Sequence, residues 1–182
     1  DIPPEAMRMH ICWLNYPGPH THDIPLKKLL GVLAKARPQG ILFEGANPRH
    51  AHEWEDLKDA GVPDDKVLIP GVIDSTSNFV EHPQLIAQRI CQYADIVGRE
   101  RVLAGSDCGF GTYAGRKGVF PSVVLGKFRA MAEGARMPRN VSGNNSDQGS
   151  IAMNKRIAVL STGVNGSCIG ADLTAAGLDV TM

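Results

Sequence analysis

Four side chains of types that bind zinc occur at separated points of the sequence. His10 and Cys12 stand two residues apart in a short apolar run, and Glu44 and Cys108 each follow a later apolar run. Residues two apart on a strand point to the same side, so His10 and Cys12 can face one metal ion while Ile11 packs on the other side. Two thiolates, a carboxylate and a neutral imidazole around Zn²⁺ leave a net charge of about −1, which keeps a bound substrate thiolate nucleophilic. We expect Glu44 to be the ligand that yields to this thiol.

Each of these residues also has a plain structural explanation. A His-x-Cys pair on an apolar strand is commonly core packing, and an Asp-Cys-Gly sequence such as residues 107–109 is commonly a turn. Zinc becomes the stronger explanation because three strand ends of one alternating array each supply a side chain of a suitable type.

Short apolar runs alternate with helix-patterned stretches through the first 137 residues. The predicted strands are residues 9–14, 40–43, 67–73 and 101–106, and the predicted helices are residues 25–37, 52–60, 82–97 and 121–135. A helix in every connection predicts parallel strands, because antiparallel hairpins need no helix. The carboxyl ends of parallel strands lie at one edge, where the candidate ligands would meet. The sequence therefore predicts an α/β fold, either half of an eight-unit barrel or a small open sheet.

Four segments together resemble a known family. They are HICWLNYPGPHTHDIPL, FEGANPRHAHEW, LIPGVIDSTSNFVEHP and LAGSDCGFGT, and in this order and spacing they are similar to the carboxyl-terminal barrel half of the cobalamin-independent methionine synthases. The resemblance covers residues 1–137 and implies the second half of a (β/α)8 TIM-type barrel, with its active site at the carboxyl face of the strands. It also implies zinc bound by His10, Cys12, Glu44 and Cys108. The implied reaction is methyl transfer from 5-methyltetrahydrofolate to homocysteine, which gives methionine.

One departure from this family concerns the methyl donor. The synthases have a histidine two residues after the aspartate that matches Asp74, where this chain has Thr76. Related enzymes use the same zinc arrangement to alkylate other thiols, including coenzyme M, so a non-folate alkyl donor is the alternative. Asp74 and Asp107 are the candidate substrate-binding residues. Asp74 would bind an ammonium group or cap a turn, and Asp107 would hydrogen-bond a zinc ligand or make an ordinary turn.

The other histidines of this region are weaker candidates. His20 and His22 lie in a loop and could act as a general acid or as spare ligands, although exposed loop histidines commonly have no role. His50 and the following residues lack the His-Glu-x-x-His spacing of metalloproteases, and we expect them to be the solvated start of a helix.

The end of the chain begins a different pattern. Residues 138–152 are rich in Gly, Asn and Ser and are predicted to be a linker. Residues 153–182 place Gly163, Gly166 and Gly170 between a strand-like and a helix-like run, a turn typical of pyrophosphate binding. This segment resembles the beginning of ketopantoate reductase, an NADPH-dependent enzyme. The resemblance implies a truncated Rossmann-like β-α-β start without reductase activity.

Composition restricts the expected partners and location. Nineteen basic residues balance nineteen acidic ones without a block of like charge, which predicts no binding to nucleic acid. The apolar runs are far shorter than the roughly 20 residues of a membrane span, and no secretory leader precedes the first strand, so a cytoplasmic location is expected. Half a barrel leaves open sheet edges, so we expect the chain to self-associate and to be inactive without a first half.

Overall fold

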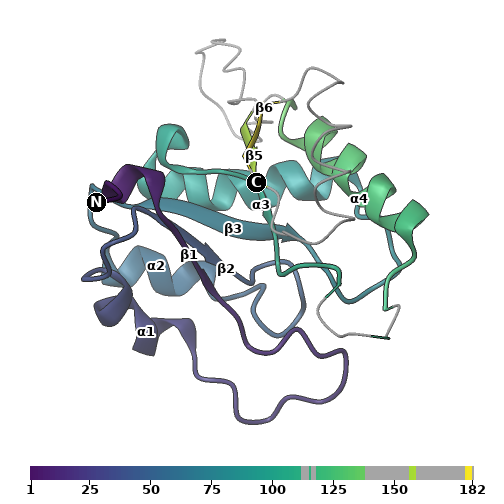
Figure 1. The fold of residues 1–182 in the computed structure, drawn as a ribbon, viewed down its shortest axis with the longest axis horizontal. Coiled ribbons are helices and arrows are strands. Elements are labelled where there is room, and N and C mark those ends of the chain that lie inside the picture. The colour runs from purple at the N-terminus through teal and green to yellow at the C-terminus, as the bar shows by residue number, and fades with distance from the viewer. Residues whose placement is uncertain (112–114, 116–117, 138–155, 159–178, 182) are drawn as a thin grey trace, which may run out of the picture.

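Four parallel strands form the main sheet of the computed structural model, which describes residues 1–111, 115, 118–137, 156–158 and 179–181. The strands lie in the order β1 (Arg8–Ile11), β2 (Gly40–Phe43), β3 (Val67–Ile73) and β4 (Gly105–Ser106), and neighbouring strands are parallel. The helices that follow them are α1 (Leu26–Leu33), α2 (Trp54–Ala60), α3 (Pro83–Val97) and α4 (Pro121–Gly134). The alternation of strands and helices, visible for β1 to β3 and α1 to α4 in Figure 1, and the parallel pairing confirm the predicted α/β fold.

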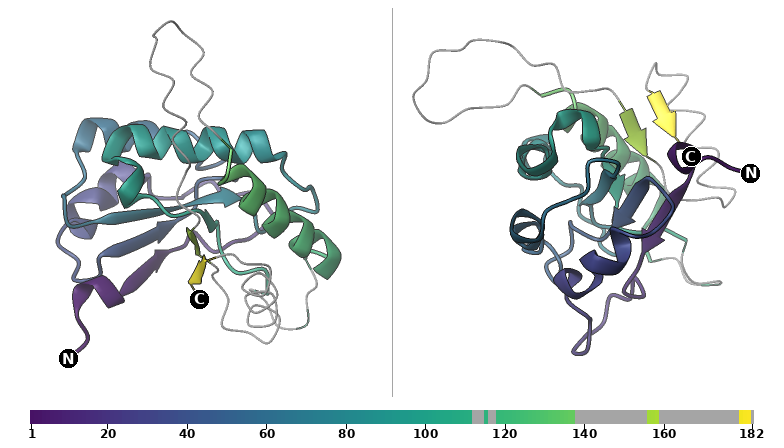
Figure 2. Two further views of the ribbon diagram at one scale, coloured as in Figure 1. Left: turned by 90° about the horizontal axis from the view of Figure 1, so that it is seen from above. Right: turned by 90° about the vertical axis from the view of Figure 1, so that its left-hand side faces the viewer.

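All four helices cover the same face of the sheet. In the right-hand view of Figure 2 they lie on one side of the strands, with β1 at the edge of the sheet. A doubly wound sheet carries helices on both faces, whereas a barrel carries them only on its outer face. The strands follow one another in sequence order and all the helices lie on one face. This arrangement is that of four successive barrel units and differs from a doubly wound sheet.

Side-chain alternation along the strands separates two apolar clusters. Ile41 and Phe43 of β2 belong to the large cluster between the sheet and the helices. Leu42, which points the other way, packs with Ile69 and Leu103 in a small cluster on the inner face. The large cluster supplies most of the apolar burial that holds the helices on the sheet, and the inner face carries the candidate ligands.

Local signals set the ends of the third helix. Pro83 occupies its first turn, and Nδ1 of His82 accepts the backbone N–H of Gln84 at 3.1 Å as an N-terminal cap. The helix ends at Val97 and is followed by Gly98, whose φ of 84° is readily adopted only by glycine. The other predicted helices are also present, but the first ends at Leu33 and the second begins at Trp54, because residues 34–37 and 48–53 form turns or irregular backbone.

Two predicted strands are shorter than expected. β1 ends at Ile11 rather than at residue 14, because Leu14 and Asn15 have φ values of 80° and 43° that a strand cannot accommodate. β4 consists of Gly105–Ser106, preceded by one isolated bridge between Leu68 and Val102. Both changes occur next to candidate ligands, where the backbone leaves the sheet to position them.

Gly71 of β3 packs directly against the turn that follows β4. A Cβ atom at this position would lie 2.7 Å from the Cα atom of Asp107 and would overlap its carboxylate. We expect Gly71→Ala to lower the free energy of unfolding by about 2–3 kcal/mol, because backbone on both sides has to move. Urea unfolding followed by circular dichroism measures this change.

Gly31 provides the matched control for that substitution. It lies inside α1, and an added Cβ would meet no atom within 4 Å. Gly31→Ala should raise the free energy of unfolding by about 0.5–1 kcal/mol, since alanine loses less backbone entropy in a helix. Equal stabilities of the two variants would contradict the close packing of β3 against the β4 turn.

A second pair of strands belongs to the carboxyl-terminal segment. β5 (Arg156–Ala158) and β6 (Asp179–Thr181) pair in parallel. The chain between them, with Gly163, Gly166 and Gly170, lies outside the described residues, as does the predicted linker. The dinucleotide-binding start therefore stays a prediction.

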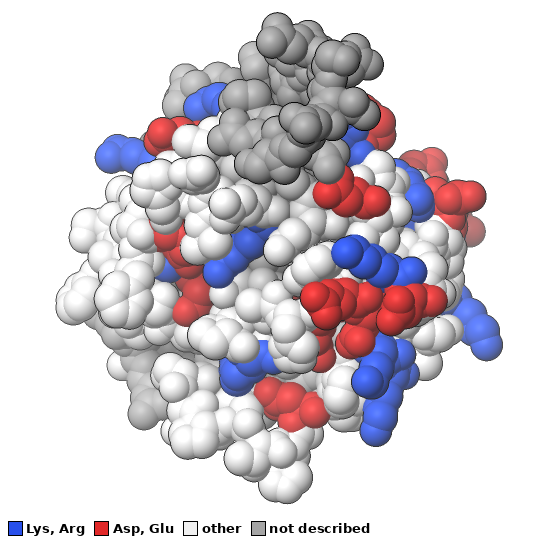
Figure 3. Space-filling view, turned by 180° about the vertical axis from the view of Figure 1, so that it is seen from behind, with Lys and Arg blue, Asp and Glu red and all other residues white. Residues whose placement is uncertain are grey.

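The described surface carries both charge signs. Figure 3 shows acidic and basic side chains next to one another on the face opposite to that of Figure 1. Among the helices that the structure describes, none combines the length and apolarity needed to cross a bilayer.

Candidate metal centre

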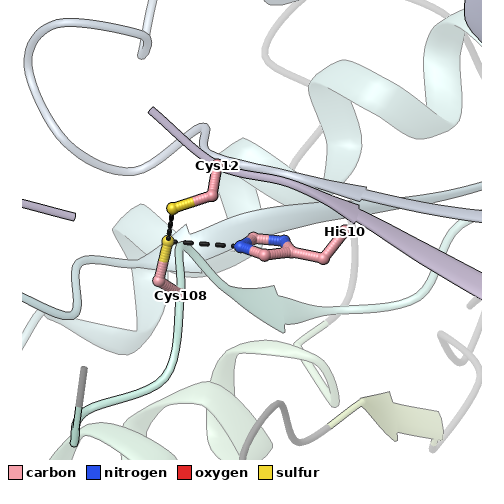
Figure 4. Close-up of side chains that lie close together, drawn as sticks. All are labelled: His10, Cys12 and Cys108. Carbon is pink, nitrogen blue, oxygen red and sulfur yellow. Dashed lines mark hydrogen bonds between the residues drawn. The ribbon is translucent and has the colours of Figure 1, made fainter. Parts of the chain in front are cut away.

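Three of the predicted ligands meet at the carboxyl end of the sheet. Nε2 of His10 lies 3.3 Å from Sγ of Cys108, and Sγ of Cys12 lies 3.4 Å from the same sulfur. One ligand atom from each residue falls within 4.8 Å of those of the other two. Figure 4 shows the three side chains converging from β1 and from the turn after β4. His10 and Cys12 are exposed, whereas Cys108 is only 3% exposed.

This convergence requires a curved sheet. β1 and β4 are the outer strands of the four-stranded sheet, and in a flat sheet three strand spacings would separate them by about 14 Å. The side chains at their ends nevertheless touch at 3.3 and 3.4 Å. The sheet therefore curls around its inner face, as strands do when they close into a barrel.

Glu44 lies beside this cluster but is not one of its three members. Its Oε1 is 3.6 Å from Sγ of Cys108 and accepts the backbone N–H of Trp13 at 2.8 Å. Its Oε2 accepts a hydrogen bond from Nδ2 of Asn47 at 2.8 Å and lies 3.4 Å from Nη2 of Arg49. The carboxylate, only 1% exposed, thus has one oxygen near the sulfur of Cys108 and one turned toward the donors Asn47 and Arg49.

Asp107 ties the turn after β4 to the loop after β2. Its Oδ1 accepts the N–H groups of Gly45 and Ala46, and its Oδ2 accepts both the N–H and the side-chain amide of Asn47, at 2.8–2.9 Å. Burial raises the pKa of this carboxyl to about 6, and these hydrogen bonds act in the opposite direction. Asp107 is 1% exposed and precedes Cys108, so it fixes that cysteine relative to Glu44.

A second bridge holds Cys108 from the other side. Oγ of Ser75 accepts the N–H of Cys108 at 3.1 Å and donates to Oδ1 of Asn15 at 2.8 Å. Nδ2 of Asn15 then donates to the carbonyl oxygen of Gly109 at 3.1 Å. The left-handed backbone at Leu14 and Asn15 directs this amide across to the β4 turn. Loops after β1, β3 and β4 are thereby joined around one cysteine.

The expectation of a solvated helix start at His50, His52 and Glu53 is wrong for His50 and Glu53, which are buried, whereas His52 is exposed. His50 is 2% exposed, its Nδ1 is 2.9 Å from Oε2 of Glu53, and its ring stacks on Trp13 with centroids 4.3 Å apart. Oε1 of Glu53 accepts the N–H of Leu26 at 2.9 Å, at the start of α1. His50 is thus buried by contact with Trp13, the residue after Cys12, although the polar residues around it suggested exposure to solvent.

Further polar side chains border Glu44 on the side away from Cys108. Nε2 of His50 lies 3.6 Å from Oδ2 of Asp23 and 4.0 Å from Oε2 of Glu44. Nη1 of Arg49 lies 3.8 Å from the same Asp23 oxygen. Sequence reasoning assigned these residues no part in the site. The Asn-Pro-Arg-His sequence at residues 47–50, a few residues after Glu44, was the signal that could have identified two of them.

Asp74, a candidate substrate-binding residue, has one carboxylate oxygen engaged locally. Oδ1 accepts both the N–H and the hydroxyl of Thr76 at 2.8 Å. The N–H of Asp74 donates to Glu81, whose other oxygen is paired with the buried ammonium group of Lys127 at 2.9 Å. This geometry matches the turn-capping interpretation, and the ammonium-binding interpretation stays a prediction.

His20 lies 2.9 Å from Asp23 in the loop after β1.

Burial changes the protonation of two of the three candidate ligands, favouring a neutral imidazole at His10 and a protonated thiol at Cys108. Although His10 is exposed as a residue, partial desolvation of its imidazole lowers its pKa, against opposing effects of the Glu44 charge and of a hydrogen bond with the Leu42 backbone. At neutral pH its imidazole is therefore uncharged and can donate a lone pair. Burial, followed by the charge of Glu44 and the contact with Cys12, raises the pKa of Cys108. Without a cation, this sulfur keeps its proton.

These protonation states predict how zinc binding depends on pH. Both thiols must lose a proton to become thiolate ligands, whereas the neutral His10 has none to lose. Zinc binding at pH 7.5 should therefore release about two protons, and affinity should rise with pH by up to about a hundredfold per unit. A pH indicator in weakly buffered solution counts the protons. Release of close to none would contradict a dithiol site.

The donor set fits zinc in type and in spacing. Around a tetrahedral zinc ion, a sulfur and a nitrogen ligand, or two sulfurs, lie roughly 3.6–3.8 Å apart. The distances from Cys108 Sγ to His10 and Cys12 are within a few tenths of an ångström of these values. Soft sulfur donors together with imidazole favour zinc over magnesium or calcium, which prefer oxygen ligands.

This chain has a distant likeness to a solved structure. No protein-family model matches the sequence, and no curated protein matches it. A solved structure of a B12-independent methionine synthase from Shewanella, in complex with selenomethionine, is similar with a TM-score of 0.46 and 20% identity. The similarity covers 70% of this chain and 36% of that one, so the chain spans about a third of the length of the synthase.

Proposed function

We propose that this chain holds zinc through His10, Cys12 and Cys108 and provides the metal-binding part of an alkyltransferase that acts on thiols. The observation that carries the proposal is the convergence of one imidazole and two sulfurs, at 3.3 and 3.4 Å, on the carboxyl rim of a curled parallel sheet. This rim is where barrel enzymes place their active sites. The resemblance in sequence points to the same ligands.

The protein side chains determine the charge of the centre. When bound, zinc supplies the positive charge that lowers the pKa of a substrate thiol. Two cysteine thiolates cancel that charge, and the neutral His10 adds none. The nearby carboxylate of Glu44 makes the surroundings of a substrate sulfur negative, which keeps it nucleophilic rather than withdrawing its electrons.

Glu44 has the contacts of a ligand that can yield its place. Its Oε1 lies 3.6 Å from the Cys108 sulfur, and its Oε2 is held from behind by Asn47 and Arg49. A small rotation would bring the carboxylate to the fourth ligand position, and its return would leave that position to the substrate. Donors on the far side keep the displaced carboxylate hydrogen-bonded, which lowers the cost of the exchange.

The transfer itself breaks one bond and forms another. The substrate thiol loses its proton on binding, its sulfur forms a bond to the alkyl carbon, and the bond from that carbon to the donor breaks. With homocysteine and methyltetrahydrofolate, the departing atom is a ring nitrogen that has to take up a proton, and the products are methionine and tetrahydrofolate.

A second candidate differs only in donor and thiol. Thr76 stands where the synthases have histidine, and its hydroxyl donates to Asp74 rather than toward a substrate. A threonine hydroxyl is also too weak an acid to protonate a leaving nitrogen at neutral pH. These facts favour a donor that needs no such acid at this position, with a thiol such as coenzyme M as acceptor.

X-ray absorption at the zinc edge tests the proposal. The zinc-loaded chain is measured before and after addition of homocysteine and, separately, of coenzyme M. We expect one more sulfur neighbour and one fewer oxygen or nitrogen neighbour with the thiol that is the substrate. A zinc spectrum that neither thiol changes would indicate a structural site and contradict the proposal. Formation of methionine with methyltetrahydrofolate, assayed after a first barrel half is supplied, distinguishes the two candidates.

A further inference from the structure

Cys12 and Cys108 are close enough to react with each other. Their sulfurs are 3.4 Å apart, and both residues are free thiols. The sulfurs of a disulfide are about 2.05 Å apart, so bond formation needs an approach of only about 1.4 Å. Cys12 lies just beyond the end of β1 and is exposed, so its side chain can turn toward the buried Cys108 without displacing core residues.

The two thiols differ in access to solvent. Cys108 is 3% exposed and is enclosed by the contacts of Ser75 and Glu44, whereas Cys12 is open to solvent. A small oxidant diffusing from solution therefore meets Cys12 first. Cys108 then lies within reach of the oxidised sulfur and is protected from separate attack. This order is that of a reactive cysteine with a resolving partner.

We infer that Cys12 and Cys108 form an oxidation site at which a peroxide converts the two thiols into one disulfide bond. The sulfur of Cys12 attacks hydrogen peroxide and becomes a sulfenic acid, and one water molecule leaves. The sulfur of Cys108 then attacks the sulfenic sulfur, and the sulfenic oxygen leaves as a second water that carries the Cys108 proton. The two sulfurs lose two electrons, and the peroxide gains them.

Oxidation and metal binding exclude each other at this site. Thiolates are the zinc ligands, and a disulfide has none to offer. The bond would leave His10 and Glu44 as remaining ligands, too few to retain zinc against dilution. Bound zinc, in turn, occupies both sulfurs and keeps them from oxidant. The same two residues therefore make the metal content of the chain dependent on the peroxide level.

The test uses the full chain with Cys91→Ser and Cys168→Ser, which leaves only the two cysteines of interest. The metal is removed with EDTA, hydrogen peroxide is added at pH 7.5, and circular dichroism verifies the fold. We expect loss of both thiols together with a mass decrease of about 2 Da, reversed by dithiothreitol. A digest should contain the peptide that links Cys12 to Cys108. Peptide mapping of the unaltered chain gives the same readout without any substitution.

Two results would overturn the inference. In the first, Cys12 gains oxygen while Cys108 still reacts with a thiol reagent after unfolding. In the second, Cys12 or Cys108 forms a disulfide bond with another chain. The Cys12→Ser variant is the control, because its buried Cys108 should stay a free thiol under the same treatment.

Zinc provides the second arm of the test. One equivalent of zinc should slow the loss of thiols by about tenfold or more, because both sulfurs are then ligands. If the disulfide forms at the same rate with and without zinc, oxidation and zinc binding do not exclude each other, and the proposed metal site is wrong. The oxidation site itself does not depend on the proposed enzymatic activity, so the two can fail separately.

Discussion

Replacement of Cys108 with serine is expected to weaken zinc binding by about a thousandfold. Serine keeps the shape of the side chain, but its hydroxyl does not ionise near neutral pH, so one of two thiolates is lost. Loss of a residue that merely supports a metal ligand costs 10–100-fold in affinity, so loss of a ligand should cost more. Competition with a chromophoric chelator gives the Kd, and elemental analysis gives the zinc content per chain.

Cys91 offers the matched control for this substitution. It is a half-buried cysteine on α3, away from the strand ends that carry the candidate ligands. Cys91→Ser should leave the Kd for zinc within about twofold, whereas Cys12→Ser should weaken binding about as strongly as Cys108→Ser. An unchanged Kd in Cys108→Ser, with the fold intact, would remove the basis of the proposed function.

Replacement of Asp107 with alanine is expected to cost about 4 kcal/mol of folding free energy. The carboxylate accepts four hydrogen bonds, three of them from backbone N–H groups of Gly45, Ala46 and Asn47. Alanine would leave these buried N–H donors unpaired. Each unpaired donor destabilises the fold by about 1–3 kcal/mol if nothing replaces its partner, and by less if the loop relaxes or water enters. Urea unfolding at pH 8, above the pKa of about 6 of this carboxyl, measures the loss.

Asp59→Ala is the control, because Asp59 is exposed on α2 and its removal should change stability by less than about 0.5 kcal/mol. Asp107→Asn should be destabilised as well, because its amide places an N–H group against N–H donors. If Asp107→Ala unfolds at the same urea concentration as the unaltered chain, the loop after β2 is not held by this residue. Zinc affinity should fall with stability, since Cys108 is the next residue.

Local pattern in the sequence was enough to predict the four strand-helix units. The apolar spacing in residues 82–97 and the glycine that follows them identify α3 with an error of one residue at its start. Predictions at the ends of β1 and β4 were less accurate. Leu14 looks like part of an apolar strand, but its φ of 80° results from contacts of its neighbours with the β3 and β4 loops, and no local propensity indicates them.

In the candidate site too, local contacts could be predicted from the sequence and long-range contacts could not. His10 and Cys12 could be predicted as a pair, because alternation along a strand puts them on one side. The partners of Asp107 could not, because they lie 60–62 residues away in sequence. Burial of His50 escaped prediction for a similar reason, since it depends on stacking against Trp13.

The amino-acid sequence by itself determined the α/β class, the parallel direction of the strands and the residue types at their carboxyl ends, because these follow from short-range periodicity and from the length of each connection. Only the tertiary structure decided that Cys108 meets His10 and Cys12 while Glu44 stands to one side with its own hydrogen bonds. Contact between the outer strands depends on how strongly the sheet curls. The curl involves all four strands together, so no single segment of the sequence encodes it.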